Sequence, residues 1–524
     1  MIIISLLLQN STFSRVKFVQ FDREDVKRTY FKEEKVMKKF MACALSVCMV
    51  AATLVGCDGN NNGGAVVDNG GNGGDGAVVV DNNNNGGDGD GAASGKTVIN
   101  LWAFTDEIPK MVDYYVSSHP DFAAKYDVKS TIVATDGGAY QTAIDQALVA
   151  GGADAPDIYA AEAAFVLKYT QGDMAQYAAA YDDLGIDSAN AIKEAQIASY
   201  TIDLGTNGDG KLVALGYQAT GGAFIYRRSV AEATWGASDP DTVKAKIGGG
   251  SGNWDQFWVA ADELKAKGFG IVSGDGDMWH AIENSSDQGW IVDGKLHIDP
   301  KREAFFDVSK KLKDNGYHND TQDWQDGWFA DMKGEGEKDV LGFFGPAWLI
   351  NYTIAANCGG NAKGEGTFGD WGVCESPIGF FWGGTWVIGS KYAVENGKAD
   401  GVAEIIYWIT LDSTKDGLQY AWANGTVDWD NDPETATSKD CVGSNTVLGI
   451  SDGSIDFLDG QNMFDIFVPA NSAANGKNLT QYDEKINTLF RDQVREYSAG
   501  NKSKEDAIAA FKQNVADELM IEAE

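Results

Sequence analysis

The chain has 524 residues, and its 77 acidic and 42 basic side chains give it a formal net charge of −35. An acidic surface of this kind repels phosphate backbones, which argues against a nucleic-acid partner. Six cysteines without a CxxC pair, and four histidines without a cluster, argue against a zinc site. We therefore expect no metal and no cofactor.

Residues 37–57 have the pattern of a secretion signal: a basic start, a short apolar run and a small residue before the last position. The apolar run is shorter than the roughly 20 residues that span a bilayer. Its last four residues, LVGC, resemble a bacterial lipoprotein signal, which implies lipidation of Cys57 and cleavage before it. Because residues 1–36 precede a complete signal, we interpret them as a mis-called extension and Met37 as the true start.

Residues 58–95 consist mainly of Gly, Asn and Asp. A segment of this composition buries too little apolar surface to offset the entropy lost on ordering. We expect it to be a disordered tether that reaches roughly 35 Å on average, as a Gly-rich coil does.

The folded part is expected to begin near Thr97. The stretch "TVINLWA" predicts a strand, and a helix is expected to begin after Pro109. "YDVKSTIVATDGG" and "DAPDIYAAE" predict two more strands, and the helix between them has one apolar face, formed by Ala143, Ile144, Ala147 and Leu148. Alternating strands and helices predict an α/β fold around a largely parallel sheet.

Two later segments have helical periodicity. Apolar side chains at 402, 405, 406 and 409 lie on one face of a helix. The final segment, 503–519, has Ser503 and Asp506 where a capping box would place them.

Three cysteines remain outside the signal: Cys358, Cys374 and Cys441. In an exported protein Cys358 and Cys374 are close enough in sequence to form a disulfide, which would stabilise the fold by about 3 kcal/mol in the chain-entropy model. Other pairings stay open. The acidic stretch "DWDNDPE" at 428–434 is expected to be a solvated loop rather than a calcium site.

Several stretches occur in an order typical of one family. "INLWAFTDEIPKMVDYY", "DAPDIYAAEAAFVLKY", "LGYQATGGAFIYRRSVAE", "VLGFFGPAWLINY" and "GDWGVCESPIGFFWGGTWVIGS" follow one another along the chain. In this order they resemble the family 1 extracellular solute-binding proteins of carbohydrate ABC transporters, to which maltose-binding protein is distantly similar. The resemblance covers residues 97–524.

The resemblance implies a type II periplasmic-binding-protein-like fold, with two α/β lobes joined by a multi-segment hinge. The chain is expected to cross between lobes near Gly216–Thr220, near Pro377–Gly383 and around 445–460. The lobes would then comprise 97–218 with 380–447, and 221–376 with 455–524.

By the same resemblance the chain is a monomeric binding protein and not an enzyme. It would be anchored outside the cytoplasm by its lipid, capture an oligosaccharide and deliver it to ABC transporter permease subunits. Neither an HExxH nor a P-loop pattern is present. Two other classes stay open: an exported glycoside hydrolase, which needs two carboxyl groups flanking the scissile bond, and a surface carbohydrate or peptide adhesin.

Fifteen tryptophans and many carboxylates suit a sugar, because aromatic rings cover the apolar face of a pyranose while carboxylates and amides bind its hydroxyls. Trp348 in "GPAW" corresponds to a family motif whose tryptophan stacks on sugar. Trp382 is preferred to Trp386, which we assign to packing, and Trp324 and Trp328 are assigned to the core. The remaining candidates for ligand contact are Trp102, Trp279, Asp106, Glu107, Glu162 and Gln218.

For the acidic candidates a structural role is an equal alternative. Asp106 could cap the following helix, and Glu162 could be a solvated carboxylate at the end of its strand. Gln218 lies at the expected hinge crossing and offers an amide.

Overall fold

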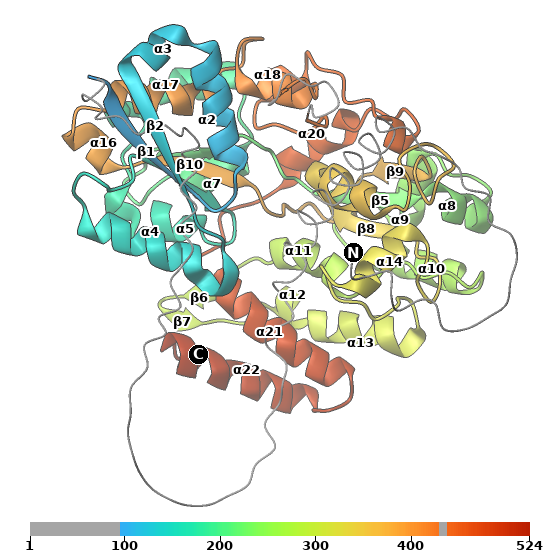
Figure 1. Ribbon diagram of the computed structural model, residues 1–524. Helices are drawn as coiled ribbons and strands as arrows, with labels where there is room; N and C mark the ends of the chain where they lie inside the picture. Colours follow the sequence, from blue (N-terminus) through green and yellow to red (C-terminus); the bar gives the residue numbers. More distant parts are fainter. Residues whose placement is uncertain (1–94, 429–436, 524) are drawn as a thin grey trace, which may run out of the picture. The chain divides into compact units, whose positions relative to one another are not determined.

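The computed structural model describes residues 95–428 and 437–523 (Figure 1). The expected signal with Cys57, nearly all of the expected tether, and most of the acidic stretch at 428–434 lie outside these residues. Among the residues described, no helix is both long enough and apolar enough to cross a membrane.

The first sheet has five strands in the order β2-β1-β3-β10-β4. Strand β1 pairs in parallel with β2 and β3, and β10 runs antiparallel between β3 and β4. Along β1 the alternate residues Ile99, Leu101 and Ala103 are buried, as the period of two in a strand requires. The bounds are β1 (Thr97–Ala103), β2 (Tyr126–Ile132), β3 (Ile158–Glu162), β4 (Ala214–Gly216) and β10 (Thr385–Gly389).

Helices connect and cover these strands, so the predicted α/β arrangement is confirmed, but the sheet is mixed rather than largely parallel, because β10 runs antiparallel to both of its neighbours. Helix α2 begins at Glu107, three residues before the predicted start, because Pro109 is tolerated in a first turn whose N–H groups need no helical partner. The helices of this part are α2 (Glu107–Ser118), α3 (Pro120–Lys125), α4 (Ala139–Ala150), α5 (Val166–Thr170), α6 (Ser188–Ala195), α7 (Ser199–Gly205), α16 (Lys391–Glu395), α17 (Ala399–Thr410), α18 (Leu418–Ala423) and α19 (Asn445–Leu448). The short 3-10 turns are η1 (Asp136–Gly138), η2 (Ala175–Tyr177) and η3 (Asp182–Leu184).

The second sheet has three antiparallel strands, with β5 (Ala223–Arg227) between β8 (Gly342–Gly345) and β9 (Trp371–Cys374). Its two faces belong to different hydrophobic cores. Ile225, Phe343 and Val373 face the core that also holds the first sheet. Phe224, Phe344 and Cys374 face a second core.

This alternation overturns the predicted disulfide. Cys358 and Cys374 are both free and buried. Cys374 pairs across the sheet with Phe224 and lies in the second core, whereas Cys358 lies in the first. The Cys358 thiol instead donates to the carbonyl oxygens of Ala355 and Gly360.

Helices pack around the second sheet, and the last two, α21 and α22, lie side by side next to α13 (Figure 1). The predicted capping box of the last helix is confirmed on one side, since the hydroxyl of Ser503 accepts a hydrogen bond from the Asp506 N–H at 3.1 Å. The elements are α8 (Arg228–Trp235), α9 (Pro240–Ile247), α10 (Asp255–Lys265), α11 (Gly276–Asn284), β6 (Ile291–Val292), β7 (Lys295–Leu296), α12 (Pro300–Glu303), α13 (Phe305–Asn315), α14 (Asp326–Lys333), the π-helical η4 (Leu349–Ile354), α15 (Ala355–Asn357), η6 (Asp456–Leu458), α20 (Phe464–Ala473), α21 (Asp483–Ser498) and α22 (Lys504–Leu519).

Connecting segments run between the two sheets and lie against one another. Residues 217–222 join β4 to β5, and residues 375–384 join β9 to β10. Gly221 forms a bridge with Phe381, and Gln218 forms one with Val442. The exact extent of each lobe stays a prediction.

Candidate functional site

Three tryptophans from distant parts of the chain meet beside these connecting segments. The Trp348 indole Nε1 donates to the backbone oxygen of Trp382 at 3.0 Å. Trp324 stacks on Trp348, with ring centroids 6.1 Å apart and an interplanar angle of 10°. Trp382 meets both rings edge-on, at 5.0 and 6.0 Å. We call Trp324, Trp348 and Trp382 the tryptophan cluster.

The local chain explains where two of these rings point. Trp348 directly precedes η4 and follows β8. After Trp382 the chain passes through Gly383 and Gly384 at φ 71° and 112°, a backbone conformation that favours glycine. Trp386, two residues beyond them, is buried and donates its Nε1 to the Thr201 backbone oxygen, which agrees with its assignment to packing.

Trp324 was assigned to the core, and the structure corrects this. Helix α14 begins only at Asp326, so Trp324 does not share a helical face with the buried Trp328. Its backbone has φ 65°, and 36% of its surface is exposed. The i, i+4 spacing was therefore misleading, and a ring that sequence reasoning placed in the core belongs to the candidate site.

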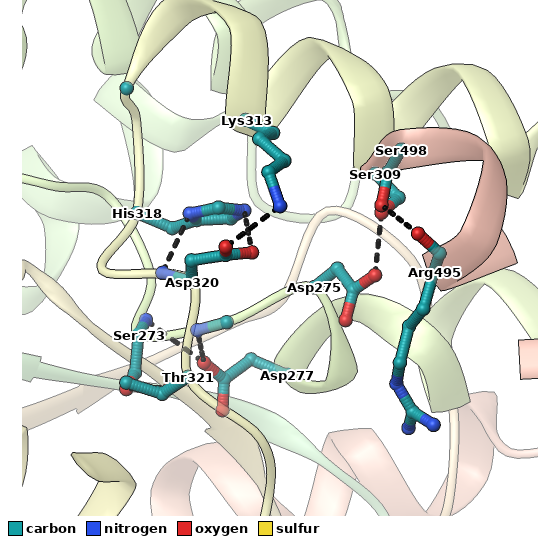
Figure 2. Close-up of polar contacts among 12 residues, drawn as sticks. Ser273, Asp275, Asp277, Ser309, Lys313, His318, Asp320, Thr321, Arg495 and Ser498 are labelled. Carbon is teal, nitrogen blue, oxygen red and sulfur yellow. Dashed lines mark hydrogen bonds and ion pairs between the residues drawn. The ribbon is translucent and has the colours of Figure 1, made fainter. Parts of the chain in front are cut away.

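Hydrogen bonds hold the segment that precedes Trp324, and Figure 2 shows Ser273, Asp277 and Thr321 of this polar network. The Asp277 carboxylate accepts from the backbone N–H groups of Ser273 and Gly274, and from the Trp328 indole at 2.9 Å. The hydroxyls of Ser273 and Thr321 are 2.6 Å apart. Arg491 of α21 donates to the partly buried Asp323 at 2.7 Å.

The serine and histidine of this network do not form a nucleophile–base pair. The Ser273 hydroxyl donates to Asp331, whereas His318 Nδ1 accepts from the Asp320 N–H at 2.9 Å (Figure 2). Burial lowers the pKa of His318. We therefore interpret these contacts as structural: they hold the segment that carries Trp324 in place.

A pocket of about 140 Å³ adjoins Trp382, which is smaller than the roughly 300–1,000 Å³ typical of small-ligand sites. Four segments line it: 162–167 after β3, 280–284 in α11, 381–383 in the connecting segment, and 479–487 at the start of α21. His280 stacks on Trp382 with ring centroids 4.7 Å apart.

Glu162 is the sequence-predicted carboxylate that lines this pocket. Burial, with a smaller contribution from the charge of Glu484, raises its pKa to about 7, against the hydrogen bond that its Oε2 accepts from the Ala164 N–H at 2.7 Å. Glu162 therefore lies in the wall of the pocket. Its role as a ligand contact stays a prediction with which this position agrees.

Gln218 and Glu107 lie near another buried carboxylate, Asp440. The Gln218 amide donates to Asp440 at 3.1 Å. Burial raises the pKa of Asp440 to about 6. Burial, and next the charge of Asp440, raise the pKa of Glu107 to about 7. The two carboxyl groups thus lie close enough to repel one another when ionised.

The remaining predicted residues lie elsewhere. Trp279 is 1% exposed and packs on Phe305 and Phe490 in the second core, so its prediction as a ligand contact is wrong. Its neighbour His280 turns to the pocket instead, because adjacent residues of a helix point in different directions. Trp102 is half-buried in β1. Asp106 is exposed, pairs with Lys110, and makes no side-chain capping bond.

Sequence reasoning missed His280 and the start of α21, including Asp483 and Glu484, which line the pocket. Local sequence carries no signal that brings these residues beside Glu162. Over residues 95–428 and 437–523, no group of three or more His, Cys, Asp or Glu side chains is arranged to hold a metal ion. The aromatic rings and carboxyl groups at the pocket can instead bind an organic molecule that has both apolar faces and hydrogen-bond donors.

The fold matches solved solute-binding structures over nearly their whole length. A crystal structure described as an extracellular solute-binding protein of family 1 is 16% identical, with a TM-score of 0.62 over 80% of this chain and 99% of the other. The galacto-N-biose/lacto-N-biose I-binding protein of the ABC transporter from Bifidobacterium longum, in complex with lacto-N-biose, is 17% identical, with a TM-score of 0.55 over 82% and 99% of the two chains. The cyclic α-maltosyl-1,6-maltose binding protein from Arthrobacter globiformis is 15% identical, with a TM-score of 0.56 over 81% and 99%.

No protein-family model matches the sequence, and no curated protein is similar to it. The structural matches are consistent with one another and agree with the order of motifs along the chain. The chain therefore has the two-lobed α/β fold of type II periplasmic binding proteins, the fold of the family 1 extracellular solute-binding proteins.

Proposed function

We propose that this chain is the solute-binding component of an ABC importer, which captures an oligosaccharide and delivers it to separate permease subunits. The observation that carries the proposal is the tryptophan cluster beside a pocket that Glu162 lines. Stacked indoles offer apolar faces to a pyranose ring, and carboxyl groups accept its hydroxyl protons. Similar folds are described as binding lacto-N-biose and a cyclic maltosyl-maltose.

Capture would follow from closure around the ligand. The connecting segments 217–222 and 375–384 join the two sheets, and the Thr220 hydroxyl donates to the Gly383 backbone oxygen at 2.8 Å. A sugar that contacts both sides would shift an open–closed equilibrium by its extra contacts in the closed state. Lipid on Cys57 would keep this binding protein at the outer face of the membrane.

Isothermal titration calorimetry of the protein against malto-, xylo-, manno- and galacto-oligosaccharides tests the proposal. We expect one series to bind with a Kd in the micromolar range or below, and no new reducing ends to form during prolonged incubation. No heat with any series would overturn the sugar assignment. Release of reducing ends would favour a glycoside hydrolase instead.

The anchor has a separate test in cells. Replacing Cys57 by Ser should move the protein from the membrane fraction to the medium, because the thiol that carries the lipid is removed. The same fractionation with Cys441→Ser, which changes a buried thiol of the folded part, is the control. Retention of the Cys57→Ser variant in the membrane would contradict lipid anchoring.

A further inference from the structure

The pocket beside Trp382 is acidic beyond the needs of a neutral sugar. Four carboxyl groups line it: Glu162, Glu283, Asp483 and Glu484, and none of the described residues that line it is Lys or Arg. Burial raises the pKa of both Glu162 and Asp483, and the charges of neighbouring carboxylates add to this: Glu484 raises the pKa of Glu162, and Glu283 raises that of Asp483.

One oxygen of this set has no partner. Asp483 is only 6% exposed, and its Oδ1 accepts from the backbone N–H and the hydroxyl of Thr480. Its Oδ2 is buried without a hydrogen bond, although the residue lines the pocket. A buried acceptor left unpaired is costly, so this oxygen is a position where a ligand donor would be stabilised.

The cations around Asp483 leave this oxygen unpaired. Arg302 is fully buried, lies over the Trp290 ring at 4.6 Å and donates to the Gln288 backbone oxygen at 3.3 Å; its charge opposes the rise in the pKa of Asp483. His280 is 3.4 Å from Glu283, whose other oxygen accepts from Asn487. Glu283 is thereby partnered, whereas Oδ2 of Asp483 is not; the Arg302 charge acts on Asp483, but its Nε and Nη2 are themselves buried without hydrogen-bond partners.

We infer that this pocket binds a primary ammonium group of the ligand. Three protons on one nitrogen match several carboxylate oxygens around a small volume, and a charge-assisted hydrogen bond is about twice as strong as a neutral one. Trp382, on which His280 stacks, supplies an aromatic edge to the carbon frame that carries the amine. The inference rests on the proposed function and narrows its ligand to an amino sugar; a free polyamine carries the same chemical group.

Titrations with matched ligands distinguish an amino sugar from a free polyamine as the source of the ammonium group. Calorimetry of the full chain at pH 7 would compare glucose, glucosamine and N-acetylglucosamine, the corresponding galactose series, and the β-1,4 disaccharides of glucose, glucosamine and N-acetylglucosamine. Spermidine and calcium chloride are titrated alone. We expect an amino sugar to bind at least about ten-fold more tightly than its neutral and acetylated counterparts, as one added charge-assisted bond predicts.

Two variants place the amine at this site. Glu484→Gln changes an exposed side chain at the first turn of α21 and should fold normally, and Asp483→Asn removes the charge of the unpartnered carboxylate. Each should reduce the preference for the amine over its matched neutral sugar by about ten-fold. Asp492→Asn, on an exposed part of the same helix, is the control and should leave this preference unchanged.

The outcomes are distinct. Equal or tighter binding of the neutral sugars overturns the amine inference and leaves the proposed function standing. Binding of spermidine with no sugar response supports the amine site and overturns the sugar assignment, and silence of every titrant overturns both. A response to calcium chloride alone that Asp483→Asn abolishes, or an amine preference that both variants retain, overturns the site assignment.

Discussion

Trp348 is fixed in place by its own indole group. Its Nε1 donates to the Trp382 backbone at 3.0 Å, and its ring is stacked on Trp324, so the ring cannot rotate without losing both contacts. A side chain held in this way enters a complex with little further loss of conformational entropy. Trp348 is therefore the residue at which a contact with the ligand is easiest to test.

Replacing Trp348 by Ala should weaken sugar binding ten- to hundred-fold, because a large aromatic contact of about 1.5–3 kcal/mol is lost. Trp348→Phe, which keeps an aromatic ring but not the N–H donor, should bind with intermediate affinity. Calorimetry measures the affinities, and circular dichroism shows whether the variants fold.

Trp254 provides the matched control for Trp348. It is a partly buried tryptophan that packs on Phe257 and Phe344 in the second core. Trp254→Ala should lower stability and leave affinity unchanged. Loss of the fold in Trp348→Ala alone would place Trp348 among the structural residues.

At the scale of elements, α21 links the pocket to the tryptophan cluster. Its first turn contributes Asp483 and Glu484 to the pocket. Two turns later Arg491 holds Asp323, the residue before Trp324. The charge of Arg491 lowers the pKa of Asp323 against the effect of burial, so this pair is ionised at neutral pH.

Replacing Arg491 by Met should lower the free energy of unfolding by about 3–5 kcal/mol, since it leaves the Asp323 charge buried without its partner. It should also weaken sugar binding, because the Trp324 segment loses its anchor. Chemical denaturation and calorimetry measure the two effects. Arg495→Met, which breaks a more exposed pair with Asp492 on the same helix, should cost no more than about 1 kcal/mol. Equal effects of the two variants would contradict the role given to Arg491.

Local sequence predicts some of these elements and cannot predict others. The strands β1 to β3 and the apolar face of α4 follow from periodicity within a few residues. The insertion of β10 between β3 and β4 depends on pairing between segments far apart in the chain, which periodicity does not report. Trp324 and Trp328 show the same limit, because their spacing fits a helix that begins only after Trp324.

In the candidate site, too, some residues can be predicted from local sequence and others cannot. The family resemblance predicts Trp348 from its motif, Glu162 from the end of a strand and Trp382 from the expected lobe crossing, and the structure places all three around the tryptophan cluster and its pocket. The prediction of Trp279 as a ligand contact missed by one residue, because the neighbouring His280 lines the pocket. Asp483 and Glu484 come from the start of a helix whose approach to Glu162 is purely a matter of tertiary structure.

At the scale of the whole molecule, charge couples stability to pH. The net charge of −35 makes the folded chain repel itself, and several carboxyl groups are buried on top of this. Glu107 has its pKa raised from 4.5 to about 7 by burial and by the charge of Asp440. Below pH 4.5 the group is protonated in both the folded and the unfolded chain. Between pH 4.5 and 7 the unfolded chain has lost this proton while the folded chain still holds it. The free energy of unfolding therefore falls over this range and stays lower above pH 7.

The variant Glu107→Gln should therefore be as stable as the unmodified protein at pH 4, and more stable by about 2 kcal/mol at pH 8, after allowance for partial exposure of the side chain. Urea denaturation at both pH values measures the difference. Glu505→Gln, an exposed carboxylate of α22, should be neutral at both. Asp440→Asn should shift the transition of Glu107 to lower pH. A stability difference that does not change with pH would contradict the pKa assigned to Glu107.

The stacking of Trp324 on Trp348, with Trp382 edge-on to both, has an optical consequence. Indoles this close exchange excitation, so the cluster should produce a coupled signal in near-ultraviolet circular dichroism and an emission spectrum that differs from that of isolated tryptophans. A ligand that slides between or over these rings would change their coupling and their exposure to water at once. The protein thus carries a built-in, label-free reporter of its own occupancy, through which unknown ligands can be screened by light alone.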